Sequence, residues 1–189
     1  MNLKSFFAKK ILQYTSAKAF TRLFFLLSLP ILFSTCGNDA TGFLMQYQRD
    51  FEIRAGLGVF DIHVFELNGI PTNKEAFFTA NGVLESDITQ IIPQNAALSI
   101  NFDNVEFGFV RTVIVEIFTR DELRGREIFF REELPQNIGT QIDLIPSLPD
   151  VKDLLTQDEF NVRIELQLRD ISPQFIETRF DFEFFAETN

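Results

Sequence analysis

The sequence predicts an all-β domain over residues 43–189, built as an antiparallel two-sheet β-sandwich that is immunoglobulin-like in architecture. Apolar and polar residues alternate with period two in most segments, which places one face of a strand on a core and the other in water. Turn signals separate these segments into seven to nine short strands, a pattern typical of sandwiches. A closed β-barrel is the alternative, because periodicity alone does not separate the two folds.

The first strand is expected over residues 43–53, where Phe43, Met45 and Tyr47 share the apolar phase. In the next strand we expect the core-facing phase to be Phe60, Ile62 and Val64. The following elements are expected to be a turn at 68–71, a short strand at 75–80, a short helix near 85–92 ended by Pro93, and a strand with Leu98, Ile100 and Phe102 inward.

The second half of the domain repeats the alternation more strongly. Val113, Val115 and Ile117 point one way, while Ile114 and Phe118 make the same strand apolar on its second face. The remaining elements are expected to be strands over 126–131, 139–145, 160–169 and 176–184, and a short helix near 147–156 capped by Ser147. The core-facing residues of the last two strands are expected to be Phe160, Val162, Ile164, Leu166 and Leu168, and Ile176, Thr178, Phe180, Phe182 and Phe184.

The N-terminal 35 residues read as an export signal rather than as part of the domain. They contain five basic residues and no acidic one, followed by the apolar run 23–33. A basic segment before a short apolar run is the pattern of a secretory signal. Eleven helical residues span only about 16 Å, roughly half of a ~30 Å hydrocarbon core. The run is therefore expected to be a signal region and not a membrane-spanning helix.

Cys36 is the single cysteine of the chain and directly follows this signal region. The segment Phe33-Ser34-Thr35-Cys36 resembles the lipobox of bacterial lipoproteins. The resemblance implies that the Cys36 thiol is acylated and that signal peptidase II cuts between Thr35 and Cys36. Residues 36–42 would then be the lipidated cysteine and a short tether. Because Gly37 is not the aspartate associated with inner-membrane retention, the resemblance favours the outer membrane where a cell has two membranes.

Charge excludes one class of partner. All 27 acidic residues lie after residue 35, against 12 of the 17 basic residues, which leaves a net charge of about −15 on that part. Nucleic-acid binding depends on Lys and Arg that neutralise phosphates, so nucleic acid is not an expected partner. The 154 residues after the signal suffice for one domain with a full core.

The chain has few of the side chains that most often act in catalysis or bind metal ions. His63 is the only histidine, and Cys36 is assigned to the anchor, so histidine-based triads, Cys–His nucleophiles and His-rich metal sites are excluded. His63 is expected on the solvent face of its strand beside Glu66. No catalytic, cofactor-binding or metal residue is predicted.

Two alternatives stay open. One is a carboxylate-based hydrolase, which would need two carboxyl groups across a cleft. Its candidate pairs are Asp103 with Glu106 and Asp158 with Glu159, and a calcium site could use Asn101, Asp103, Asn104 and Glu106. The other is a hydrophobic-ligand carrier, if the fold is a barrel.

The leading hypothesis is a membrane-anchored, non-catalytic binding or assembly module of the cell envelope. Its partners would be the membrane, through the lipid on Cys36, and another envelope protein. Phe175 and Phe185 fall on the outward phase of the last strand and are the predicted partner contacts, because exposed apolar side chains mark interaction sites.

Overall fold

The computed structural model describes residues 41–101, 105–120, 122 and 124–189. Cys36 and the signal region lie outside the described residues, as do Phe102, Asp103 and Asn104. The strands are β1 (Gly42–Ile53), β2 (Ile62–Pro71), β3 (Ile88–Ile100), β4 (Val110–Phe118), β5 (Arg126–Arg131), β6 (Gln141–Pro146), β7 (Glu159–Leu168) and β8 (Ile176–Thr188). The helices are α2 (Lys74–Asn81) and α3 (Lys152–Leu155), with 3-10 turns at Glu85–Asp87 and Phe107–Phe109.

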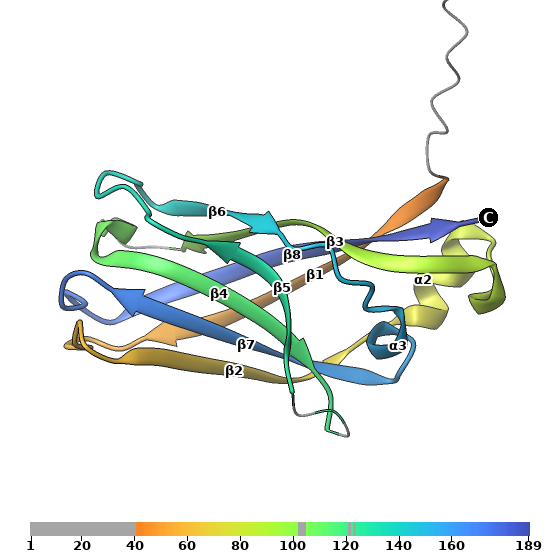
Figure 1. Ribbon diagram of the computed structural model, residues 1–189, viewed down its shortest axis with the longest axis horizontal. Coiled ribbons are helices and arrows are strands. Elements are labelled where there is room, and N and C mark those ends of the chain that lie inside the picture. The colour runs from red at the N-terminus through yellow and green to blue at the C-terminus, as the bar shows by residue number, and fades with distance from the viewer. Residues whose placement is uncertain (1–40, 102–104, 121, 123) are drawn as a thin grey trace, which may run out of the picture. The chain divides into compact units, whose positions relative to one another are not determined.

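The strands form two antiparallel layers, which confirms the predicted sandwich (Figure 1). The eight strands have one hydrogen-bonded order, β1-β8-β3-β6-β5-β4-β7-β2, and we call its first four strands sheet A and its last four sheet B. A short pairing joins them, because Phe129 and Phe130 of β5 lie opposite Pro146 and Ile145 of β6. The other ends of the two sheets, β1 and β2, do not pair with each other among the described residues. The same arrangement can be seen as a barrel left open between β1 and β2.

The strand pairs are nested like one long hairpin that has been rolled up. β1 pairs with β8, β2 with β7, β3 with β6 and β4 with β5, all antiparallel. The turn between β4 and β5 is the tip of this hairpin, and each remaining connection crosses from one sheet to the other. Eight strands wound in this way make a jelly roll. The sandwich is therefore of the jelly-roll kind and does not have the strand order of an immunoglobulin domain.

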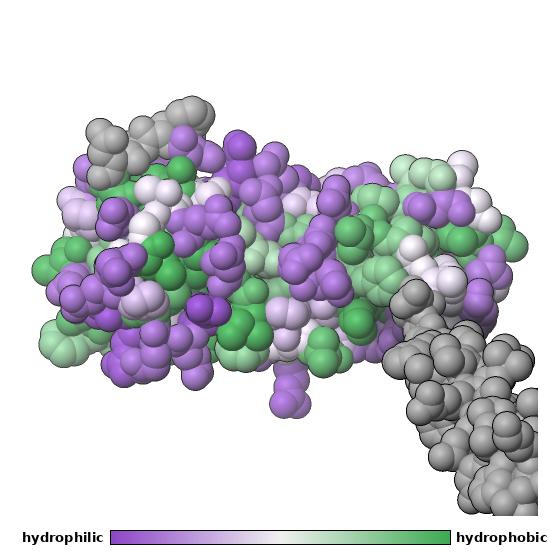
Figure 2. All heavy atoms as spheres, turned by 90° about the horizontal axis from the view of Figure 1, so that it is seen from above, coloured by the Kyte–Doolittle hydropathy of each residue, from purple (hydrophilic) through white to green (hydrophobic). Residues whose placement is uncertain are grey.

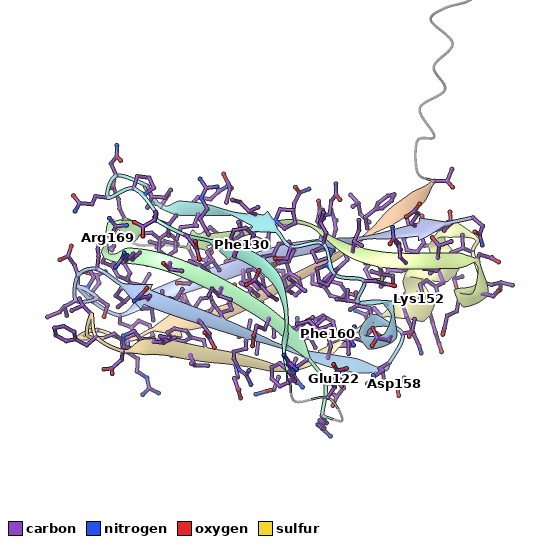
Figure 3. All side chains as sticks on the ribbon, in the orientation of Figure 1. Glu122, Phe130, Lys152, Asp158, Phe160 and Arg169 are labelled. Atoms are coloured by element: carbon purple, nitrogen blue, oxygen red, sulfur yellow. The ribbon has the colours of Figure 1, made fainter. Side chains whose placement is uncertain are left out.

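Phenylalanine fills the space between the sheets. Five rings have essentially no exposed surface, and they are Phe107, Phe129, Phe160, Phe180 and Phe184. Phe160 points inward from β7 (Figure 3). Tyr47 packs among these rings, with ring centroids 5.2 Å from Phe160 and 5.4 Å from Phe182. The predicted inward phases of the first strand and of the two C-terminal strands are thereby confirmed.

Two predicted elements between β2 and β3 are wrong. Residues 75–80 form helix α2 and not a strand, and Gly82 ends that helix in a left-handed conformation with φ 66°. Residues 88–92 belong to β3 and not to a helix, because they pair with the end of β8, where Ile92 lies opposite Phe185. The pairing of β3 with β8 within sheet A overrides the local helix signal of a serine before the segment and a proline after it.

The predicted orientation of β2 is also wrong. Ile62 and Val64 face solvent, while Phe65 and Leu67 pack against the core. Both phases of this strand are apolar, so periodicity could not choose between them. The register with β7 chooses, because Phe65 lies opposite the buried Ile164.

The segment 68–71 is a bulge inside β2 and not a turn between strands. The register with β7 shifts between Leu67 and Ile70, and Gly69 has a φ of 65°. The amide of Gly69 donates to the side chain of Asn161 at 2.9 Å. A glycine at positive φ is a common component of such bulges.

The predicted helix near 147–156 is confirmed as α3, although it is shorter than expected. Its start is held by Asp150, whose carboxylate accepts the amide of Lys152 at 2.9 Å, and not by Ser147. The Ser147 hydroxyl instead donates to Glu127 at 2.6 Å.

Candidate functional site

The jelly roll has two unlike ends (Figure 1). The chain enters β1 at Gly42, and the same end carries α2, α3 and the C-terminus. We call this the helix end. The opposite end, the loop end, is made by the connections 54–61, 132–140 and 169–175, together with residues 105–109 before β4. Since the twelve residues of β1 span about 40 Å, the loop end lies that far from the point where the chain enters.

Hydrogen bonds hold the connections of the loop end together. The Ser172 hydroxyl donates to the carbonyl of Arg54 at 2.6 Å and accepts the amide of Leu57 at 2.9 Å. The Arg169 guanidinium, visible at this end in Figure 3, donates to the carbonyls of Val110, at 3.3 Å, and Leu134. The residues around connections 54–61 and 169–175 are thus positioned by the fold.

Apolar side chains nevertheless protrude from these two connections. Phe60 is 98% exposed, Ile171 is 63% exposed and Phe175 is 51% exposed. Ile62, at the start of β2, is 61% exposed. We call Phe60, Ile62, Ile171 and Phe175 the loop-end patch. In a view from above, apolar side chains reach the surface at this end of the domain (Figure 2). Sequence reasoning identified Phe175 but placed Phe60 and Ile62 in the core.

A groove of about 790 Å³ lies between β1 and β2, where the roll is open. We call it the seam groove. Phe51 of β1 and Phe65 of β2 meet across it, with ring centroids 5.1 Å apart. Nearer the helix end, the buried Tyr47 hydroxyl donates to the carbonyl of Thr72 at 2.7 Å, and burial raises the pKa of this phenol. Side chains and not a strand ladder therefore close this part of the roll.

Carboxylates dominate the rim of the seam groove, whose charged and basic lining residues are Asp50, Glu52, Glu66 and Glu177 against Arg54 and His63. Asp50 lies 3.0 Å from Arg179, and the hydrogen bond from that arginine lowers the pKa of Asp50. Glu66 lies 3.2 Å from Arg163. Glu52 and Glu177 face each other across the β1–β8 pairing, and no ion pair joins either of them to a basic side chain within the described residues.

The two predicted partner contacts do not form one surface. Phe175 belongs to the loop-end patch, whereas Phe185 lies near the helix end of β8 between Leu44 and Ile92. Ten residues of extended chain separate the two phenylalanines by about 33 Å. The ring of Phe185 is half-buried and occupies the space that a side chain at Gly42 would need.

The second apolar face predicted for β4 is covered by an arginine. Phe118 is buried, and the Arg163 guanidinium lies 4.8 Å from its ring centroid. Arg163 also bridges Glu66 and Glu116, at 3.2 Å and 3.1 Å. The Phe118 ring is therefore covered by a side chain of the neighbouring strand β7.

The prediction that His63 faces solvent beside Glu66 is wrong. His63 is half-buried, and its Nε2 atom lies 2.7 Å from the carbonyl oxygen of Gly58. This contact ties the connection 54–61 back onto β2. His63 thus has a structural partner at the base of the loop-end patch.

Of the carboxylates considered for a hydrolase or calcium site, Asp158 and Glu159 line one hollow of about 370 Å³, where Glu159 pairs with Arg120 at 2.9 Å. Glu106 is exposed, while Asp103 and Asn104 lie outside the described residues. No group of three His, Cys, Asp or Glu side chains suited to a metal ion occurs in the described part of the chain. Within residues 41–101, 105–120, 122 and 124–189, the carboxyl pKa values displaced by their surroundings are those of Asp50 and Asp153, and arginines lower both. A carboxylic general acid requires a raised pKa.

A second hollow, of about 700 Å³, lies on the outer face of sheet A beside Ala96 and Ala97. Its carboxylates are already engaged with neighbouring amides. Gln48 donates to Asp181 at 2.7 Å, and Gln46 donates to Glu183 at 3.1 Å. The seam groove has an apolar floor and an exposed strand edge. We therefore take the seam groove as the better candidate for a site that binds a partner.

No family model and no curated protein matches the chain. Among solved structures it is similar to the capsid asymmetric unit of cyanophage Pam1, with 9% identity and a TM-score of 0.38 over 81% of this chain and 91% of that one. It is also similar to desmodium yellow mottle tymovirus, with 9% identity and a TM-score of 0.30 over 78% and 89%. Scores at this level carry no inference, so the jelly-roll assignment rests on the strand pairing.

The described residues contain two short helices, and none has the length and apolar character needed to cross a membrane.

Proposed function

We propose that this protein is a lipoprotein of the cell envelope, anchored through Cys36, whose jelly-roll domain binds a polypeptide partner without catalysis. The observation that carries the proposal is the loop-end patch: Phe60, Ile62, Ile171 and Phe175 are exposed at the end opposite to the entry of the chain. Clustered exposed apolar residues mark interaction sites. A chain tethered before Gly42 would hold this patch about 40 Å from its point of attachment.

The geometry of the patch supports binding over catalysis. Its side chains are apolar, and the hydrogen bonds of Ser172 and Arg169 hold the supporting connections in place. Aromatic side chains often dominate interface energies, and the patch contributes two of them, Phe60 and Phe175. The aromatic packing between the sheets does not favour the carrier alternative.

The anchor is tested by the Cys36→Ser variant of the full chain. We expect it to accumulate as an uncut, unacylated precursor, because cleavage of this type requires the lipidated thiol. Mass spectrometry of the N-terminus reads the outcome. An unmodified Cys36 in the mature wild-type protein, or an N-terminus at another residue, would contradict the anchor.

The binding surface is tested by photocrosslinking in the cells that produce the protein. Benzoylphenylalanine at position 60 should yield a discrete crosslinked product, and the same group at position 148 should not. Leu148 is the matched control, since it is 75% exposed and lies between β6 and α3 at the helix end. The product at position 60 should be lost in a Phe175→Ser background. Equal crosslinking at both positions would reject the loop-end patch as the binding surface.

A further inference from the structure

The outer edge of β2 is available for pairing with another strand. β2 is the last strand of sheet B and pairs with β7 on one side only, within the described residues. From Ile62 to Leu67 it contains no lysine or proline, and its bulge begins only after Leu67. Natural edge strands avoid unwanted pairing through lysines, prolines and bulges. This stretch of about 20 Å lacks all three.

The seam groove runs along this same edge. All six residues from Ile62 to Leu67 line it, although their side chains alternate between the two faces of the sheet. Because residues from both faces of the sheet line it, the groove runs along the main chain of β2 and not over one face of sheet B. Phe51 and Phe65 supply an apolar floor that alternate side chains of an added strand could cover. Main-chain groups beside an apolar floor are the features that recognise an extended polypeptide.

Charge specifies the polypeptide further. Glu52 and Glu177 line the groove and lie directly opposite each other on β1 and β8. Like charges in this arrangement are destabilising. A cationic side chain placed between them would remove the repulsion. The other two carboxylates of the rim, Asp50 and Glu66, are already paired with Arg179 and Arg163, so the charge available to a partner is that of Glu52 and Glu177.

We infer that the bound part of the partner is an extended segment with alternating apolar and basic residues, which adds a strand to sheet B along β2. Its apolar side chains cover Phe51 and Phe65, and its basic side chains approach Glu52 and Glu177. The inference rests on the proposed function and specifies the partner class, since Ile62 belongs to both the loop-end patch and the seam groove.

The test uses the full chain in non-ionic detergent and a fluorescent ten-residue peptide of alternating lysine and valine. Two further peptides are N-methylated, one at every valine and the other at every lysine. Alternate residues of a strand point their amides to opposite edges, so strand pairing needs only one of these two sets. We expect one methylated peptide to bind at least about tenfold more weakly than the other, because it loses several hydrogen bonds.

The location is tested on the protein. Glu52→Lys and Glu177→Lys should each weaken peptide binding several-fold, whereas Glu75→Lys, which makes the same charge change on α2, should not. Amide hydrogen exchange at residues 62–67 should slow when the peptide binds. Circular dichroism must show that each variant keeps its β-spectrum, and a variant that unfolds is replaced by its Gln counterpart.

Three results would overturn the inference. Equal binding of both methylated peptides would mean adsorption by charge alone, and absence of peptide binding would reject the recognition class. A dimer of the full chain that Val64→Lys dissociates would assign the edge to a second copy. In the first two cases, crosslinking at position 60 would still support the proposed function, so the two failures are distinguishable.

Discussion

Truncation of Phe184 to alanine should destabilise the domain far more than truncation of its neighbour Phe185. Phe184 has no exposed surface, and its ring centroid lies 5.9 Å from Phe182, 6.0 Å from Tyr47 and 6.3 Å from Phe129. These neighbours come from three other positions on both sheets. They are held by strand pairing and cannot collapse into the space that the ring leaves.

The expected cost for Phe184→Ala is about 4 kcal/mol, in the middle of the range for a buried phenylalanine. For a domain of this size, that lowers the midpoint of thermal unfolding by roughly 12 °C. Phe185 is half-buried on the outer face of sheet A, so Phe185→Ala should cost about 1 kcal/mol. The two residues have the same side chain and adjoin each other on one strand. The difference between the two variants therefore measures the effect of facing the core instead of the outer surface of sheet A.

Urea unfolding followed by far-UV circular dichroism measures both free energies. The slope of the unfolding free energy against urea should stay unchanged, so that only the midpoint moves. If the two variants differ by less than about 1 kcal/mol, the inward orientation of Phe184 and the aromatic cluster around it are refuted.

Three further predictions concern the core and the ion pairs. Ile164→Asp should unfold the domain by burying an unpaired charge, whereas Glu165→Ala, on the other face of β7, should be nearly neutral; similar losses in circular dichroism would contradict the face assignment. Thr178→Val should raise the unfolding free energy by about 1 kcal/mol, because the buried Thr178 hydroxyl has no hydrogen-bond partner among the described residues, and a loss would point to a missing partner. Hydrogen bonding to Arg126 lowers the pKa of Asp153 in the folded state. The pair therefore contributes its full stability above the unfolded pKa of Asp153, which is about 4. This contribution is lost as the pH falls through the lower pKa of the folded state. The thermal midpoint of Asp153→Asn should therefore fall less than that of the wild type between neutral and acidic pH, with Glu75→Gln as the control, and equal falls would exclude the pair from acid unfolding.

Period-two alternation by itself determined the all-β class, without separating a sandwich from a barrel, and the inward faces of the strands with one apolar phase. In β7 every second residue is apolar and the residues between are polar, and β8 departs from this pattern only at Thr178 and at Phe185 to Thr188, so each strand has one face that can be buried. The predicted core residues Ile164, Phe180 and Phe184 are buried for this reason. The basic signal region and Cys36 likewise follow from local sequence alone, and they remain predictions because they lie outside the described residues.

Only the tertiary structure decided the orientation of β2 and the identity of residues 88–92. In both places the local pattern allowed two answers, and a partner distant in sequence selected one: Ile164 of β7 for Phe65, and the end of β8 for β3. The candidate site depends on the same long-range pairing. Phe60 and Ile62 are exposed because β2 turns its other phase to the core, and the seam groove exists because the rolled hairpin ends in two strands, β1 and β2, that do not pair with each other. Closure of a sheet depends on the order of all its strands, a property that no single segment of the sequence carries.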